Sequence, residues 1–510
     1  MHHKIMNEIL EYWNLSDEQK DEIINPKIKV YKHEGFELFM KNANRLMVCG
    51  DYDCDGVTST SIALLLAQQL KIEAGFYIPN RLTQGYGLSL ETVDLAYEKG
   101  YTDLLLVDNG VKAIEAIDKA LAYGMNVAVV DHHLMDQDLP NDVVFVHPDL
   151  IEDDYFSTMS AGGLMFALAE GMSLDNEYME ALGALATVAD VMPLWGKNRE
   201  IVRRGVDALN KNQFLQFDAL VKRSRYTQYT AEFLAFQVSP KINSIGRMAD
   251  KVNINTAVSY FLSDSQAQIK SYAAQVLEVN SYRKQLGAHY QKDARTKINQ
   301  HDIQIISSTS YHEGLLGIIA NHISQETGKP SIVLREYDDV YKGSARSGNI
   351  SLESLFSQLN PNYFIAMGGH DFAYGMTIKK EYYDNFENDL YSMIQKTDPT
   401  TQEFDGITVD YTELTRDLIR LLKQYEPLGE GIKIPLMRMN LPQTYKLVRL
   451  NGHGYKLLFN DGTLDEALLF TKTINEYEIS QSKSISFKLN LQDQNKFTIY
   501  IEELFDTVVR

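Results

Sequence analysis

The segment Asp51-Tyr52-Asp53-Cys54-Asp55-Gly56 places three carboxylates directly after the apolar run 46–49, which is typical of a short buried strand. Three acids packed beside an apolar edge repel one another unless a cation offsets their charge. A calcium loop would need a bidentate glutamate at its twelfth position. Counted from Asp51, that position is Ile62. The pattern therefore predicts a metal site, but not a calcium loop.

Two further apolar runs end in polar motifs. The run 104–107 leads into Asp108-Asn109-Gly110, and the run 127–130 leads into Asp131-His132-His133. Helical segments separate the three runs, so the order is β-α-β and we predict an α/β fold with a parallel sheet. Ligands of such sheets bind beyond the carboxyl ends of the strands, where all three acidic motifs fall.

A fourth acid, Asp190, stands near the end of the largely apolar segment 184–193, before Pro193. Alone, an aspartate in this position is more often a cap or a turn residue than a ligand. Taken in order, however, the four motifs resemble the DHH phosphoesterase superfamily. Its members share an Asp-x-Asp triplet, a lone Asp after the next strand, an Asp-His-His motif and a later Asp. The resemblance implies a DHH catalytic domain that hydrolyses phosphoesters.

The same resemblance implies a ligand set. Asp53 would hold one metal ion and Asp55 the other, Asp108 would bridge them, and His132 and Asp190 would complete the shell. Carboxylate oxygens with one imidazole suit two Mn²⁺ ions, or Mg²⁺. Two ions about 3.5–4 Å apart can activate a water molecule and neutralise the charge that develops during phosphoryl displacement.

Three neighbouring residues are predicted to take part in catalysis. Asp131 is expected to orient His132, as carboxylates often do for metal-bound imidazoles. His133 is expected to contact a phosphate or donate a proton, with a structural hydrogen bond as the alternative. Asp51 could be a ligand, a partner of a ligand or a support of its loop.

Downstream motifs resemble the DHHA1 accessory domain, which holds the substrate opposite the metal centre. They are Ser344-Ala345-Arg346-Ser347, Gly368-Gly369-His370 and the segment 312–317, which begins with His312. Glycines let backbone amides approach an anion closely, and Arg346 can grip a phosphate with two parallel hydrogen bonds. We therefore expect this part of the chain to bind the phosphates and bases of the substrate.

Within the superfamily the chain most resembles the RecJ family of single-strand-specific 5′ to 3′ DNA exonucleases. The segments that carry this resemblance are 79–81, 85–87 and 239–247. Lys241 stands where RecJ proteins commonly have arginine. A lysine keeps the positive charge but cannot donate two parallel hydrogen bonds, so the role of that arginine cannot simply be assigned to Lys241. The residues that the two resemblances assign to substrate binding are Arg81, Tyr86, Arg247, His312, Ser344, Arg346, Gly368, Gly369 and His370.

A chain of 510 residues is longer than one core usually supports. We predict an N-terminal segment and a DHH catalytic domain over 1–250, a connecting helix over 251–300, an α/β DHHA1 domain over 301–396 and an OB-like domain over 401–510. Beyond about residue 401, short alternating runs at 445–450, 455–459, 484–489 and 497–501 predict strands. Such strands after a helix fit a β-barrel of the OB type, which binds single strands by aromatic stacking.

The net charge is −20, from 49 basic and 69 acidic residues. This balance is opposite to that of a protein that coats DNA nonspecifically. Any DNA-binding surface must therefore be confined to a local groove. The expected partner is single-stranded DNA with a 5′ end, with a single-strand-binding protein or a helicase as further partners, and the protein is expected to be a monomer.

The chain has two cysteines, which is too few for a disulfide framework. The N-terminal segment is charged, and no apolar run has membrane-spanning length. Together with the low cysteine content, these features predict a cytoplasmic protein. The favoured function is hydrolysis of single-stranded DNA in repair or recombination. Two alternatives remain. They are a phosphodiesterase for short oligoribonucleotides or cyclic dinucleotides, and a replication scaffold that keeps the fold without catalysis.

Overall fold

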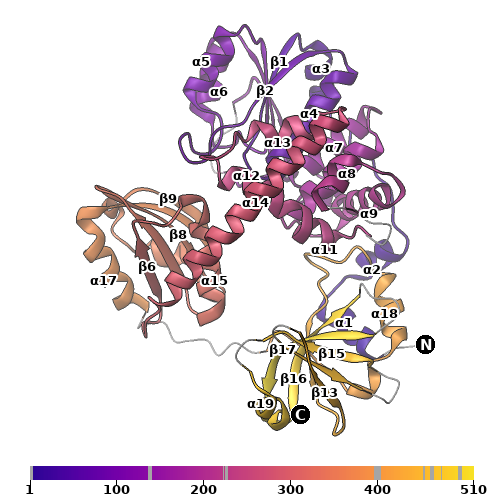
Figure 1. Cartoon of the computed structure of the whole chain (residues 1–510). Coiled ribbons are helices and arrows are strands. Elements are labelled where there is room, and N and C mark those ends of the chain that lie inside the picture. The colour runs from indigo at the N-terminus through magenta and orange to yellow at the C-terminus, as the bar shows by residue number, and fades with distance from the viewer. Residues whose placement is uncertain are drawn as a thin grey trace.

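The structure is a computed structural model. It describes residues 4–509 except 136–139, 222, 224–227, 395–403, 452–453, 460–463, 472–473 and 492–496. The described residues form three sheets, and the long helix α14 (Gln266–Arg295) runs from the first sheet region toward the second (Figure 1). Within the described residues, no helix has the length and apolarity needed to cross a membrane.

The first sheet has five parallel strands in the order β2-β1-β3-β4-β5, which confirms the predicted parallel α/β fold. Its strands are β1 (Arg45–Cys49), β2 (Glu73–Tyr77), β3 (Asp103–Val107), β4 (Asn126–Val130) and β5 (Val143–Val146). Helices α5 (Leu90–Glu98) and α6 (Ile114–Ala122) cover one face, and α3 (Glu34–Asn42) and α4 (Cys54–Gln69) cover the other (Figure 1).

Side chains of β1 and β3 alternate between these two faces. Met47 and Leu104 pack with residues of α5 and α6, whereas Val48 and Leu105 pack with residues of α3 and α4. Both faces are therefore apolar, which is why these strands read as continuous hydrophobic runs.

A helical region follows the sheet and carries Asp190 at the end of α8. It consists of the 3₁₀ turns η1 (Pro148–Leu150) and η2 (Asp154–Phe156), then α7 (Ala161–Gly171), α8 (Glu177–Ala189), α9 (Gly196–Lys211), α10 (Leu215–Val221), α11 (Ala231–Phe233), the π-helical turn η3 (Leu234–Val238), α12 (Ser239–Arg247) and α13 (Asn255–Leu262). Helices α7 and α8 pack on α4. They thereby reach the edge of the sheet where the acidic motifs lie.

The second sheet has the order β6-β7-β8-β10-β9 and a hydrophobic core of its own. Its strands are β6 (Gln304–Ser308), β7 (Ser331–Glu336), β8 (Val340–Arg346), β9 (Phe364–His370) and β10 (Ala373–Lys379). Only β6 and β7 pair in parallel. The accompanying helices and turns are η4 (Glu313–Leu315), α15 (Leu316–Thr327), α16 (Leu352–Phe356), η5 (Pro361–Tyr363), η6 (Lys380–Tyr382) and α17 (Tyr383–Ile394).

The third sheet has seven strands in the order β11-β12-β16-β17-β15-β14-β13. Its elements are β11 (Gly406–Thr408), η7 (Tyr411–Glu413), α18 (Arg416–Lys423), β12 (Leu436–Asn440), β13 (Lys446–Arg449), β14 (Tyr455–Leu458), β15 (Glu466–Leu469), α19 (Glu476–Gln481), β16 (Ser484–Asn490) and β17 (Thr498–Phe505). All four strands predicted beyond residue 401 are present. Closure of this sheet into an OB-type barrel stays a prediction, as do the domain boundaries.

The N-terminal helices connect the third sheet to the first sheet region. Helix α1 (Lys4–Tyr12) packs beside α18 and β11, and α2 (Asp17–Ile24) follows it (Figure 1). One hydrophobic cluster runs from α4 and α8 through α1 into the third sheet. The third sheet therefore shares this core with α4 and α8, whereas β6 and β7 of the second sheet belong to another cluster, which joins them to Met248 at the end of α12 and to α14.

Candidate active site

The first acidic motif forms the turn from β1 into α4. Asp53 is the N-cap of α4, and its Oδ1 accepts a hydrogen bond from the Gly56 amide at 3.0 Å. Gly56 is required because a Cβ there would lie 2.4 Å from the Asp51 carbonyl oxygen. The cap fixes the direction of the Asp53 carboxylate.

Asp55 points to the start of a different helix. Its Oδ2 accepts a hydrogen bond from the Ala161 amide at 2.9 Å, and its Oδ1 accepts one from the Gly162 amide at 2.8 Å. Both amides belong to the first turn of α7, whose positive dipole end favours a carboxylate. Two backbone amides thus hold this buried carboxylate.

Asp55, Asp108 and Asp190 surround the imidazole of His132. His132 Nε2 lies 3.3 Å from Asp108 Oδ1, 3.4 Å from Asp190 Oδ2 and 3.7 Å from Asp55 Oδ2. Side chains from four different segments of the chain therefore meet at His132 Nε2.

Asp108 also takes part in two other groups. Ligand atoms of Asp51, Asp53 and Asp108 lie within 4.8 Å of one another, and so do those of Asp108, His132 and His133. Asp108 has a left-handed backbone with φ 60°, and its amide donates to the Val130 carbonyl at 3.0 Å. This conformation turns the Asp108 side chain back over the sheet edge, between the groups.

The carboxylates of the cluster are buried close together, so a cation would stabilise their ionised forms. Burial, with the charge of Asp53, raises the pKa of Asp55 to about 7. Burial, with the charges of Asp55 and Asp53, raises the pKa of Asp190 to about 9. Burial and neighbouring carboxylates also hold the pKa values of Asp51 and Asp108 well above their usual range. Such carboxylates ionise together only when positive charge is supplied.

Two buried atoms of the cluster lack a hydrogen-bond partner, namely Asp51 Oδ1 and His132 Nε2. Burial and the neighbouring His133 lower the pKa of His132 to about 4, so its imidazole is neutral at pH 7, as a metal ligand must be. Unpartnered buried acceptors beside crowded carboxylates fit a divalent cation, and the oxygen-rich set fits Mn²⁺ or Mg²⁺.

Asp131 has a different partner from the predicted one. Its Oδ1 lies 2.8 Å from His133 Nδ1 and accepts from the His132 backbone amide, so it holds the ring of His133 and not that of His132. The reason is local. The His132 ring turns toward Asp108, and the next side chain in the turn folds back over Asp131. The prediction that Asp131 orients the His132 ring is therefore wrong.

Tyr86 is also part of this arrangement. Its hydroxyl donates to the Asp108 carbonyl at 2.9 Å and lies 3.0 Å from His133 Nδ1, and the two rings meet edge to face. Burial opposes protonation of His133, but the hydrogen bond to Asp131 outweighs it and raises the pKa of His133. With Nδ1 engaged by these two residues, Nε2 is the nitrogen left to act on a substrate.

The arginines predicted to bind the substrate lie close to one another. Burial lowers the pKa of Arg247 to about 9, and the nearby charges of Arg81, Arg283 and Arg346 add to this effect. Arg346 Nη1 donates to Ser344 Oγ at 2.9 Å, so the predicted pair is in contact. Clustered cations that lower one another's pKa form a site for an anion.

His312 does not present a free nitrogen to a substrate. Its Nε2 lies 3.0 Å from Asp250 Oδ1, and its Nδ1 accepts a hydrogen bond from the Gly314 amide. The ring therefore links the end of the catalytic region to η4 of the second sheet region. Its role in substrate binding stays a prediction.

Gly368, Gly369 and His370 lie at the end of the edge strand β9 and are exposed. Gly368 has open space where a Cβ would project, whereas a Cβ on Gly369 would lie 2.2 Å from the Ala373 carbonyl oxygen. Their backbone is thus accessible, and their role in substrate binding stays a prediction.

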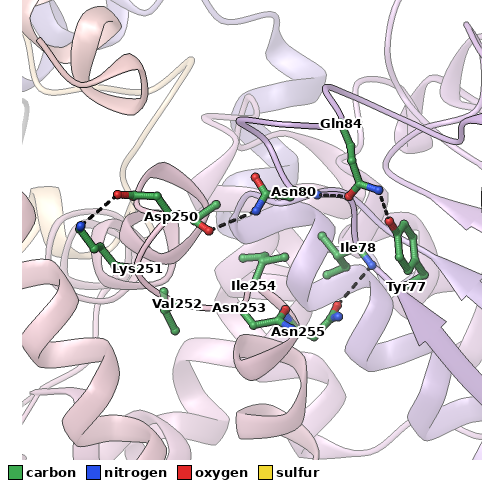
Figure 2. A pocket seen from close by; sticks show the side chains of 11 residues that line it. Tyr77, Ile78, Asn80, Gln84, Asp250, Lys251, Val252, Asn253, Ile254 and Asn255 are labelled. Carbon is green, nitrogen blue, oxygen red and sulfur yellow. Dashed lines mark hydrogen bonds and ion pairs between the residues drawn. The ribbon is translucent and has the colours of Figure 1, made fainter.

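A cavity of about 430 Å³ lies beside the loop that carries Arg81. Figure 2 shows Asn80, Gln84 and Asn255 around it, with Asp250 on the opposite side. The Asn80 side-chain amide donates to the Ala249 carbonyl, and Asn255 Oδ1 accepts from the Ile78 amide. The loop that carries Arg81 is thereby attached to the segment that follows α12.

Comparisons with known proteins agree with this geometry. The model of the DHH family, N-terminal domain, matches residues 45–192, and the model of the DHHA1 domain matches residues 302–397. Residues 45–192 therefore belong to the DHH family, and residues 302–397 form a DHHA1 domain.

Relatives of this chain include exonucleases. It is 30% identical over 383 residues to the single-stranded-DNA-specific exonuclease RecJ of Bacillus subtilis, a match that spans 72% of this chain and 48% of that protein. It is 27% identical over 496 residues to RecJ of Haemophilus influenzae, over 88% of this chain and 85% of that protein. The crystal structure of RecJ in complex with Mn²⁺ from Thermus thermophilus has the same fold, with a TM-score of 0.81 at 22% identity, over 99% of this chain and 78% of that one.

The DHH-family site also contains residues that sequence analysis missed. Asn243 Oδ1 accepts from the Cys54 amide at 2.8 Å, and a Cβ on Gly246 would lie 2.3 Å from the Tyr52 carbonyl oxygen. Helix α12 therefore supports the loop of the first motif. The segment 239–247 was recognised by its resemblance to RecJ proteins, but only Arg247 was assigned a role there. Arg283, on α14, had no sequence signal of its own.

Proposed function

We propose that this protein is a metal-dependent exonuclease that hydrolyses single-stranded DNA from its 5′ end. The observation that carries the proposal is the position of Asp108, which belongs both to the group with Asp51 and Asp53 and to the group with His132 and His133. A carboxylate shared in this way can serve two ions at once. The basic cluster of Arg81, Arg247 and Arg346 supplies the complementary site for a phosphate.

Two Mn²⁺ or Mg²⁺ ions would be held by Asp53, with Asp51, on one side and by Asp55, His132 and Asp190 on the other, with Asp108 between them. When bound, such ions supply an activated water molecule and neutralise charge on the phosphoryl group. The protein positions the ligands through the caps of α4 and α7. His133, held by Asp131 and Tyr86, is placed to donate a hydrogen bond or a proton through Nε2.

Arg346, with Ser344, would hold the 5′-terminal phosphate, and Arg81 and Arg247 would hold the phosphates next to it. An arginine offers two parallel donors to a phosphate, and the partial burial of Arg346 limits competition from water. The 5′ end would thus be fixed at a set distance from the acidic cluster. We propose repair or recombination in the cytoplasm as the setting, with a monomeric enzyme that works beside a helicase or a single-strand-binding protein.

A digestion panel with Mn²⁺ tests the proposal. End-labelled single-stranded DNA, double-stranded DNA, RNA and dinucleotides are incubated side by side, and the release of mononucleotides from each end is measured. We expect release from the 5′ end of single-stranded DNA above all. Preferred hydrolysis of dinucleotides would favour the phosphodiesterase alternative, and no hydrolysis of any substrate would favour the scaffold.

A further inference from the structure

A segment of the third sheet region lies against the loop that follows Asp190. We call residues 425–433 the connector and residues 190–195 the Asp190 loop. The Leu194 amide donates to the Glu430 carbonyl at 2.9 Å. A Cβ on Gly429 would lie 2.7 Å from Leu194 Cδ1, and a Cβ on Gly431 would lie 2.7 Å from Trp195 Nε1. The side chains of Leu194 and Trp195 thus occupy the space into which a Cβ at position 429 or 431 would project.

Arg199, in the first half of α9, holds the connector in this position. Its Nη1 donates to the Pro427 carbonyl at 2.9 Å, and its Nη2 donates to the carbonyls of Tyr425 and Glu426 at 2.9 Å and 3.1 Å. Arg199 is only 3% exposed. A buried guanidinium that bonds three consecutive carbonyls fixes the path of the chain, which a lysine could not do as well.

The Asp190 loop needs such support because its backbone is unfavourable. Val191 has a left-handed conformation with φ 56°, which is rare for a β-branched side chain, and it is 60% exposed. A conformation of this kind persists only when surrounding contacts impose it. Asn198 supplies one contact, from its side-chain amide to the Pro193 carbonyl at 3.0 Å. The connector supplies the contacts on the other side.

We infer that the connector is a positioning element for Asp190, with Arg199 as its positioning residue. The inference rests on the proposed metal-binding role of Asp190. Asp190 Oδ2 lies 3.4 Å from His132 Nε2, and the loop after Asp190 determines whether the carboxylate stays there. Binding of an ion at Asp55, His132 and Asp190 therefore depends on docking of the third sheet region through the connector.

The chain contains a natural probe of this contact. Both of its tryptophans touch the connector. Trp195 packs on Gly431. The ring of Trp13 lies tilted against that of Tyr425, with 5.6 Å between ring centres, and its Nε1 donates to the Lys433 carbonyl at 2.6 Å. Tryptophan emission of the metal-free protein therefore reports whether the connector is docked.

The test uses the full chain with Arg199→Gln, and Arg203→Gln as the matched control, because Arg203 is an exposed arginine on the same helix. Mn²⁺ binding is measured by the loss of the electron paramagnetic resonance signal of free Mn²⁺, and tryptophan emission is measured without metal. For Arg199→Gln we expect about a 10-fold loss of affinity for one of two ions and a red shift of the emission. Arg203→Gln should match the wild type in both.

A second variant, Gly431→Ala, tests the same contact if Arg199→Gln fails to fold. Its Cβ would meet Trp195, and its φ of 80° disfavours alanine, so we expect the same selective loss of one ion. Folded variants that bind both ions as tightly as the wild type would overturn the inference, with or without an emission change. A wild-type protein that binds no Mn²⁺ would instead overturn the proposed function.

Discussion

His132 Nε2 lies 3.3 Å from Asp108 Oδ1, although the two residues follow different strands. Strands β3 and β4 are parallel neighbours, and Val107 pairs with Val130. The residues that follow these two positions therefore emerge at the same edge of the sheet. The register of one strand pair thus brings the Asp108 and Asp-His-His motifs together.

Replacing Asp108 by Asn should lower hydrolysis by more than about 100-fold while the fold is retained. The neutral asparagine side chain cannot offset the charge of two ions. The substitution also removes a buried carboxylate that neighbouring carboxylates repel, so the metal-free variant should be at least as stable as the wild type. Activity assays and thermal unfolding in EDTA check both points. Substantial turnover by the folded variant would refute the shared-ligand role.

The stability of the metal-free protein should fall as pH rises from about 5 to 9. The folded state raises the pKa of Asp55 to about 7 and that of Asp190 to about 9. In this window the folded protein binds more protons than the unfolded chain, so unfolding is favoured as pH increases. Thermal unfolding in EDTA across this range measures the effect.

Asp190→Asn is the control for this pH dependence, since it removes one of the two titrating groups. Its melting temperature should fall less steeply with pH than that of the wild type. Saturating Mn²⁺ should also reduce the slope, because the ion offsets the carboxylate charges. Identical slopes for the variant and the wild type in EDTA would contradict the assignment.

Asp131→Asn should lower kcat by about 10- to 100-fold, with a smaller change in KM. The substitution weakens the bond that orients His133 and removes the charge that raises the pKa of His133. The basic limb of the pH–rate profile should therefore move to lower pH. The double variant with His133→Ala should lose little more than His133→Ala alone. Additive losses would show that Asp131 acts independently of His133.

Arg346→Ala should lower the preference for a 5′-phosphate by about 10-fold, which is the value of one charge-assisted hydrogen bond. The measurement compares rates on 5′-phosphorylated and 5′-hydroxyl strands of the same sequence. Arg420→Ala is the control, because Arg420 is exposed on α18 in the third sheet region. An unchanged ratio for Arg346→Ala would remove this residue from the 5′-phosphate site.

The sequence predicted the parallel sheet and the acidic motifs at its edge because both follow from local patterns. Apolar runs of strand length mark β1, β3 and β4, and Asp53, Asp108 and His132 stand directly after them. Their proximity then follows from the geometry of any parallel sheet. For this reason the structure brings Asp53 and His132 close to Asp108, and their roles as metal ligands stay predictions.

Contacts between distant segments could not be predicted in this way. The amides of Ala161 and Gly162 that hold Asp55, and the side chain of Asn243 that supports Cys54, depend on how helices pack on the sheet. Arg199 and the connector are a further case, since no local pattern links α9 to residues 425–427. Such contacts are set by tertiary packing, and one sequence carries no periodic signal for them.

Anomalous diffraction from a crystal of the protein grown with Mn²⁺ tests the central claim most directly. We predict two anomalous peaks that share Asp108 as a ligand, one beside Asp51 and Asp53 and the other beside Asp55, His132 and Asp190. Peaks outside this cluster, or a single peak that Asp108 does not contact, would contradict the account.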